Sequence, residues 1–269
     1  MRPSLALAWV TLKEGLRERA FLGIMIFAFL LLLASGAIAD LSIGNVIKVT
    51  QDLGLATVSF TALLLAFFMG THLIAKDLDK RSIYMVLSKP IGRGHYILGK
   101  YTGLTILVGL STALVTLFML VTTFYFYKTT RLYTPPHVAW IKLVVASFFI
   151  FLEASLILAI SLFFSSFSSS ALLALFLTLA VYLVGQSTRQ VMEFIQGPLG
   201  KRTSPVVKGL AKVAYYVFPD LSLLDLKTAA VHDLPMPSGD LVKAFLYTTA
   251  YVVFLLVAAT LIFRKREMK

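Results

Sequence analysis

Six long apolar stretches dominate the sequence, and each is long enough to cross a bilayer as a helix. A helix needs about 20 predominantly apolar residues to span the hydrocarbon core. The stretches that meet this requirement lie near residues 20–39, 54–75, 97–126, 139–164, 169–188 and 242–263. The pattern predicts an all-α polytopic membrane protein with six transmembrane helices in one domain, residues 20–269.

The first 19 residues show a different pattern, in which apolar and charged positions alternate at helical spacing. The apolar positions are Leu5, Trp9, Leu12 and Leu16. Charged residues such as Lys13 and Glu14 fall on the opposite side. A helix of this kind lies in the headgroup plane. We therefore expect residues 1–19 to form an amphipathic interfacial helix; a solvated extension of the first span is the alternative.

The first apolar stretch ends in Ala37, Ile38 and Ala39 before Asp40, which is also typical of a signal-peptidase site. We favour a transmembrane helix, because this apolar core is long for a signal and the preceding arm contains acidic residues. Cleavage would leave five spans and would not change the side on which the carboxy terminus lies.

The distribution of charge predicts the orientation. An even number of spans places both termini on one side, and cationic residues cluster at both ends of the chain. The positive-inside rule makes that side cytoplasmic. The predicted extracytoplasmic segment, residues 187–241, also carries cations, but long loops obey the rule less strictly. We expect a multi-pass protein of the cell inner (plasma) membrane with both termini in the cytoplasm.

Two further features lie between the later spans. The serine-rich residues 165–170 leave room only for a tight helical hairpin between the fourth and fifth spans. In the extracytoplasmic segment, apolar residues recur at near-helical spacing at Val207, Leu210, Val213, Ala214 and Val217. This spacing predicts a short helix on the outer membrane surface.

The segment from Asp77 to Lys100 is polar and basic, yet apolar spans flank it on both sides. Its centre, residues 83–87, is apolar enough for a short amphipathic helix. Pro90 and Gly92 then end that helix and turn the chain, because proline cannot continue a helix and glycine frees the following dihedrals. This loop, residues 76–100, suits docking onto a partner in the cytoplasm.

Composition and motifs argue against nucleic-acid binding, nucleotide binding and metal binding by this chain. The net charge of +12 and 58% hydrophobic residues fit anionic headgroups better than nucleic acid, so we expect no nucleic-acid partner. Gly94, Gly99 and Lys100 match GxxxxGK, but Tyr101 follows where a phosphate-binding loop needs Ser or Thr. There is no cysteine, and the four histidines show no metal-ligand spacing. We predict no catalytic, metal or cofactor site on this chain.

Glu153 falls near the middle of the fourth span. An ionised carboxylate there costs at least ~2.5 kcal/mol unless it is protonated or paired. Glu153 is therefore a candidate for a transport pathway. The alternative is a neutral glutamic acid that is hydrogen-bonded to Ser or Thr of a neighbouring helix, or a packing contact at a subunit interface.

The loop resembles the type 2 permease family of ATP-binding-cassette (ABC) exporters, particularly the branch with copper-enzyme-maturation and gliding-motility permeases. Asp77 and Asp79 stand where the family has glutamates, and residues 83–87 match its apolar run. Residues 88–93 match its proline-containing turn, and residues 98–100 match its LGK entry to the third span. The amphipathic arm, the six spans and the basic tail extend the resemblance over almost the whole chain.

The resemblance implies a dimer with a second permease copy or homologue. Each permease would grip a separate ABC ATPase, which binds the ATP and Mg²⁺, through the loop between the second and third spans. The residues expected to carry this coupling are Asp77, Asp79, Arg81, Ile83, Leu87, Lys89, Pro90, Gly92 and Arg93. Arg81 and Ser82 replace the family's usual Gly-Thr pair, which affects the expected start of the coupling helix.

Two other classes of function stay open at this point. A membrane-embedded enzyme would act without an ATPase and would use Glu153 or His72 in catalysis. An assembly scaffold would bind partners without a nucleotide-dependent change. The family serves chemically diverse cargo, so the resemblance selects no substrate, and export is expected from the resemblance alone.

Overall fold

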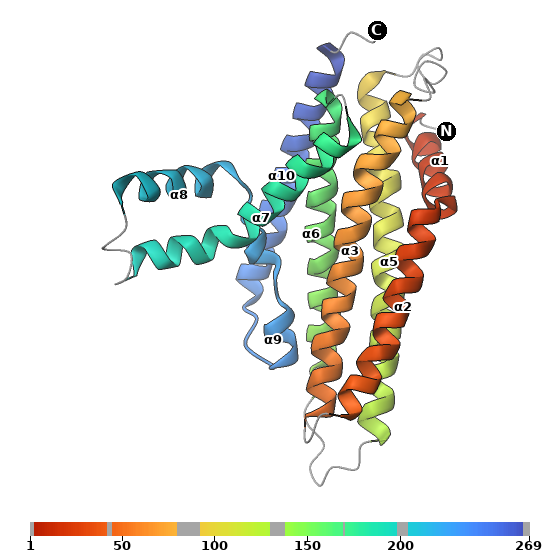
Figure 1. The fold of residues 1–269 in the computed structure, drawn as a ribbon, viewed down its shortest axis with the longest axis vertical. Coiled ribbons are helices and arrows are strands. Elements are labelled where there is room, and N and C mark those ends of the chain that lie inside the picture. Colours follow the sequence, from red (N-terminus) through yellow and green to blue (C-terminus); the bar gives the residue numbers. More distant parts are fainter. Residues whose placement is uncertain are drawn as a thin grey trace.

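The computed structural model describes residues 3–41, 45–79, 92–129, 138–168, 170–197 and 204–265. Every element formed by these residues is helical (Figure 1). In chain order the elements are α1 (Pro3–Arg17), α2 (Arg19–Asp40), α3 (Val46–Asp79), α5 (Arg93–Thr129), α6 (Trp140–Phe167), α7 (Ala171–Gln196), α8 (Pro205–Val217), the 3-10 helix η2 (Leu221–Leu224), α9 (Lys227–Val231) and α10 (Ser238–Lys265).

Six of the described helices, α2, α3, α5, α6, α7 and α10, are long and apolar enough to cross a membrane. This confirms the all-α, six-span prediction. Most boundaries lie within about one helical turn of the prediction, and two differ by more. Helix α3 begins at Val46 rather than near residue 54, and α7 continues to Gln196 rather than ending near residue 188.

The early start of α3 follows from burial of polar side chains. Thr50 and Gln51 read as loop residues in the sequence, but both are buried in the bundle. The Thr50 hydroxyl donates to the carbonyl of Val46 at 2.8 Å, one turn back in the same helix. A polar side chain that bonds its own helix backbone is compatible with an apolar environment.

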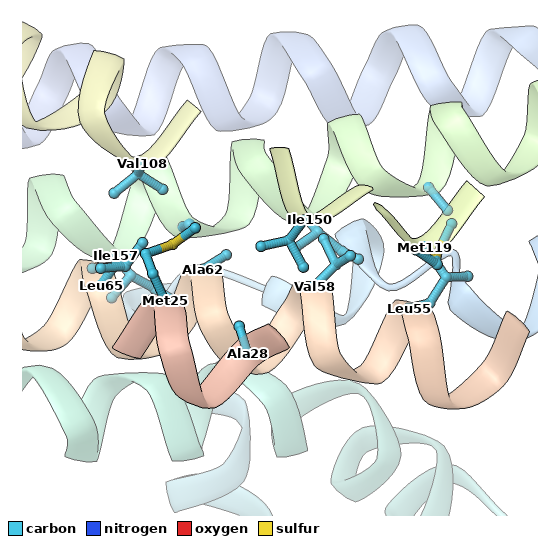
Figure 2. Packing of buried hydrophobic residues seen from close by; sticks show 14 of the residues in the cluster. Met25, Ala28, Leu55, Val58, Ala62, Leu65, Val108, Met119, Ile150 and Ile157 are labelled. Atoms are coloured by element: carbon cyan, nitrogen blue, oxygen red, sulfur yellow. The ribbon is translucent and has the colours of Figure 1, made fainter. Parts of the chain in front are cut away.

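The bundle is built around α3 and α6, which are the most buried of the six helices. Figure 2 shows Leu55 of α3 beside Met119 of α5, and Val58 of α3 beside Ile150 of α6; all four belong to one apolar core. In contrast, α2, α7 and α10 expose many large apolar side chains. Such surfaces suit lipid or another membrane helix, since water does not contact them in a bilayer.

The α3 and α6 backbones approach closely at a glycine. A Cβ atom added at Gly70 would lie 2.5 Å from Ser161 Oγ, which is too close for any real side chain. Small residues allow membrane helices to pack at short range, where van der Waals contact replaces the missing hydrophobic driving force.

The serine-rich hairpin between α6 and α7 is confirmed. Helix α6 ends at Phe167 and α7 begins at Ala171. The Ser168 hydroxyl donates to the Ser170 carbonyl at 2.9 Å and accepts from the Ser170 amide at 3.4 Å. These two bonds close the bend and leave no space for an inserted domain.

The predicted short helix is also confirmed, as α8. It packs against the end of α7, and α8 and this end of α7 project sideways from the bundle (Figure 1). After α8 the chain returns to the bundle, where Ala230 and Val231 of α9 join the main core. Lys142, near the start of α6, secures this return by donating to the carbonyl of Leu234 at 2.8 Å.

Helix α1 is separated from α2 by Glu18, whose ψ of 134° interrupts the helix. It packs along α5 and buries Ala8, Thr11 and Leu12. Leu5 and Trp9 stay exposed. The depth of this helix in a bilayer, and with it the division of the chain at residues 19 and 20, stays a prediction.

Candidate functional site

The predicted coupling loop connects α3 to α5. Asp77 and Asp79 lie in the last turn of α3, Gly92 immediately precedes α5, and Arg93 is its first residue. The other predicted coupling residues, Arg81, Ile83, Leu87, Lys89 and Pro90, lie outside the residues that the structure describes. The coupling role of all these residues stays a prediction.

The lengths of α3 and α5 show where their ends fall relative to a bilayer. Helix α3 has 34 residues and α5 has 37. At about 1.5 Å per residue both exceed 50 Å, whereas the hydrocarbon core is about 30 Å thick. The end of α3 and the start of α5 lie at the same end of the bundle as both described termini (Figure 1). These helix ends can therefore extend beyond the hydrocarbon together with the termini.

The start of α5 is formed by a local cap. The backbone amides of His95 and Tyr96 donate to the Gly92 carbonyl at 2.9 and 3.3 Å. Gly94, Gly99 and Lys100 then lie on the continuous helix. A phosphate-binding loop needs a non-helical backbone that wraps around the phosphates, so the GxxxxGK match forms no such loop here.

Lys100 is part of a buried ion pair instead. Its side chain is only 3% exposed, and its Nζ lies 3.4 Å from Glu14 Oε2 of α1. Sequence reasoning placed Glu14 on the polar face of the arm and Lys100 in the basic loop, and did not connect them. The pair joins the amino-terminal helix to the helix that follows the coupling loop.

Glycines bring α1 and α5 close enough for this pair. Gly99 and Gly103 form a GxxxG pattern on the face of α5 that contacts α1. A Cβ atom at Gly103 would lie 2.6 Å from the Ala8 carbonyl oxygen, and one at Gly99 would lie 2.8 Å from Leu7 Cδ2. Backbone contact at this range is typical of GxxxG interfaces.

A second contact fixes the start of α5 to α10. Tyr96 and Phe263 stack with ring centroids 5.8 Å apart and planes 11° apart, and both side chains are buried. Helix α5 is thus fixed to α1 on one side and to α10 on the other, within its first two or three turns.

Glu153, near the middle of α6, is 1% exposed. The Gln186 side-chain amide of α7 donates to its Oε1 atom at 2.5 Å. The expected hydrogen bond to a neighbouring helix is present, but its donor is an amide rather than the predicted Ser or Thr hydroxyl. Gln186 was not identified from the sequence because it falls at the end of the predicted fifth span.

The surroundings of Glu153 form a polar cluster where α3, α6 and α7 meet the returning segment. Lys227 at the start of α9 and Asp225 just before it both lie within electrostatic range of Glu153, and their charges act on it in opposite directions. The Lys227 ammonium donates to Ser59 Oγ of α3 at 3.4 Å and lies 3.5 Å from Asp225 Oδ1. The sequence counted Lys227 among the loop cations and did not place it beside a membrane helix.

The segment that carries Lys227 is itself held in place. Asp220 Oδ1 accepts from the amide and the hydroxyl of Ser222 at 3.1 and 2.6 Å. The Asp220 amide donates to the Tyr247 hydroxyl of α10 at 2.9 Å. A Cβ atom at Gly185 of α7 would lie 2.6 Å from the Pro219 carbonyl oxygen, so the chain crosses α7 at close range.

Within the described residues, no group of three or more His, Asp or Glu side chains could hold a metal ion. The polar groups described above connect helices of the bundle.

One comparison with known proteins agrees with this architecture, and it is a match to a protein-family model. A comparison with curated protein sequences found no match. The family model described as ABC-2 family transporter protein matches residues 5–268, which is nearly the whole chain. The chain therefore belongs to the ABC-2 transporter family, whose members are multi-pass permease subunits of ABC transporters.

Proposed function

We propose that this chain is the permease of an ABC exporter, and that separate ATPase subunits dock at the loop of residues 76–100 and drive it. The observation that carries the proposal is the anchoring of the first turns of α5, which form the end of this segment. Lys100 pairs with Glu14 of α1, and Tyr96 stacks on Phe263 of α10. A displacement of the loop therefore reaches three helices of the bundle directly.

The mechanism follows from the stiffness of helices. ATP binding closes the two ATPases, and the apolar residues 83–87, held in a cleft on each ATPase, move with them. The charged residues Asp77, Asp79, Arg81, Lys89 and Arg93 fix the docking through ion pairs. Helices α3 and α5 then shift as rigid bodies against α6 and α7, and this shift changes the side to which the transport route opens.

The assembly we propose contains two permeases, either two copies of this chain or this chain with a homologue. ATP and Mg²⁺ are bound by the ATPases. Both termini and the coupling loop face the cytoplasm from the inner membrane. This is supported by the common end of the bundle at which the described termini, the end of α3 and the start of α5 lie, and by the cationic sequences of the termini and the loop. Within the family we place the chain in the copper-enzyme-maturation and gliding-motility branch, on residues 88–93 and 98–100.

The test is to purify the tagged full-length chain from its native membrane and reconstitute it with the ATPase that co-purifies. We expect ATP hydrolysis that the transported compound stimulates, and accumulation of that compound only with a hydrolysis-competent ATPase. A matched preparation with an ATPase that binds but does not hydrolyse ATP is the control.

Three results would contradict the proposal. Chemical turnover by the purified chain alone would indicate a membrane-embedded enzyme. Partner binding without any nucleotide-dependent change would indicate a scaffold. Co-purification without an ATPase, under conditions that preserve other membrane complexes, would remove the energy source that the proposal requires.

A further inference from the structure

Helices α5 and α10 form an open groove of about 560 Å³ at the end of the bundle where the chain enters α5. Its walls are apolar and include Leu98 of α5 with Val253, Val257 and Leu261 of α10. All four side chains are exposed. The base is set by the close approach of the helices, since a Cβ atom at Gly94 would lie 3.2 Å from Thr260 Cγ2.

The length of the groove matches one leaflet. Its α10 wall runs from Val253 to Arg264 along one helical face. At about 1.5 Å per residue this distance is about 16 Å, which is close to half of the roughly 30 Å hydrocarbon core. A groove of this length accommodates an extended acyl chain from the headgroup level to the bilayer centre.

The mouth of the groove is polar and cationic. His95 and Arg264 line it, and both are exposed. Gly92 and Gly94 line the same mouth, so the first turn of α5 presents its positive dipole end there. None of the described residues that line the groove is acidic.

We propose that this groove binds one anionic phospholipid from the leaflet beside the chain termini. The phosphate lies against Arg264 and His95, and one acyl chain lies along Leu98, Val257 and Leu261. Basic pockets between transmembrane helices are known to suit anionic headgroups. A soluble anion would leave the apolar wall unused, and a lipid without net charge would make no use of the charge of Arg264.

The site has a consequence for the start of α5. Gly92 both lines the groove and caps α5 through its carbonyl. A bound headgroup therefore contacts α5 and α10 at the point where the chain enters α5. We expect the lipid to hold these two helix ends together, independently of whether the chain transports anything.

The test uses the purified full-length chain and native mass spectrometry, with phosphatidylglycerol and phosphatidylcholine of identical acyl chains as probes. We expect one tightly bound phosphatidylglycerol per chain and weaker phosphatidylcholine binding. Arg264→Gln should weaken phosphatidylglycerol binding about fivefold, which corresponds to about 1 kcal/mol for one cation near the headgroups. Arg264→Lys should retain binding within about twofold, because the charge remains.

Matched controls separate the site from general effects of charge and bulk. Arg189→Gln removes an exposed arginine of α7 outside the groove and should leave binding unchanged. Val257→Trp fills the groove from an exposed position and should weaken binding, whereas Leu246→Trp on the same helix, also exposed but outside the groove, should not. The conservative Arg264 variants keep the test decisive if a tryptophan variant fails to fold.

Several results would overturn the proposal. Equal binding of the two lipids, or unchanged binding in Arg264→Gln, would remove the role of the cationic mouth. Full competition by glycerophosphate would show that the anion binds without the acyl chain.

A second experiment identifies what occupies the groove. The chain contains no cysteine, so a photoreactive label on Leu261→Cys reports this position alone. Labelling of phospholipid is expected, and cross-linking to a second copy or to residues 80–91 would show that protein occupies the groove.

Discussion

Lys100 of α5 and Glu14 of α1 form an ion pair at 3.4 Å, in which the lysine is buried and the glutamate is 26% exposed. The two residues are far apart in the sequence, and the pair connects the amino-terminal helix to the helix that follows the predicted coupling loop. The unequal exposure predicts unequal costs of removing either partner.

We expect Glu14→Ala to destabilise the protein by on the order of 3 kcal/mol, because it removes an anionic partner of a buried ammonium group. Lys100→Met should cost about 1 kcal/mol, because the apolar stem stays packed and the glutamate can hydrate. Thermal unfolding in one detergent measures both. Equal costs, or a larger cost for Lys100→Met, would show that the pair does not govern this contact.

The α1–α5 contact should also be sensitive to single methyl groups. Gly103→Ala places a Cβ atom 2.6 Å from the Ala8 carbonyl oxygen, so α1 must move away from α5. We expect a lower melting temperature and weaker protection of α1 from hydrogen exchange.

Gly23→Ala on α2 is the matched control for this substitution. Nothing lies within 4 Å of a Cβ atom there. Alanine favours a helix over glycine by about 1 kcal/mol in water, so this variant should be neutral or more stable. A similar loss of stability in both variants would indicate a general intolerance of α-helical glycine replacement rather than close packing.

Glu153 and Gln186 should behave as one energetic unit. Glu153→Ala and Gln186→Ala each break the same buried hydrogen bond, so we expect each to cost about 1–3 kcal/mol. The double variant should cost clearly less than the sum, because the second substitution has no bond left to break. Gln190→Ala, at an exposed position of α7, should change stability by less than about 0.5 kcal/mol. Additive costs at Glu153 and Gln186 would contradict this coupling.

The coupling loop should be required for energy transfer rather than for insertion. We expect Arg93→Glu and Pro90→Gly to leave the protein in the membrane and to uncouple ATP hydrolysis from transport. The first reverses a docking charge, and the second removes the stiffness of the turn. Both rates are measured in the reconstituted complex. Lys243→Glu, at an exposed residue near the start of α10, is the control and should retain coupling. Normal coupling in both loop variants would refute the proposed role of the loop.

The candidate site was only partly predictable from the sequence. Glu153 was identifiable because a carboxylate in the middle of an apolar span is rare and costly. Its partners were not, since Gln186 and Lys227 belong to segments whose polarity is ordinary for loops and helix ends. Their relation to Glu153 depends on how α7 and the returning segment pack against α6.

The sequence by itself determined the six membrane helices, the bend at residues 165–170 and the short helix α8. These features depend on local properties, namely the length of an apolar run, the spacing of apolar residues and the preference of serine for helix ends. The tertiary structure alone decided the Glu14–Lys100 pair, the Gly103–Ala8 approach and the groove between α5 and α10. Nearly every residue of a membrane helix is apolar, so hydrophobicity does not identify which face meets which neighbour. That choice is made by close packing of small residues and by a few buried polar bonds.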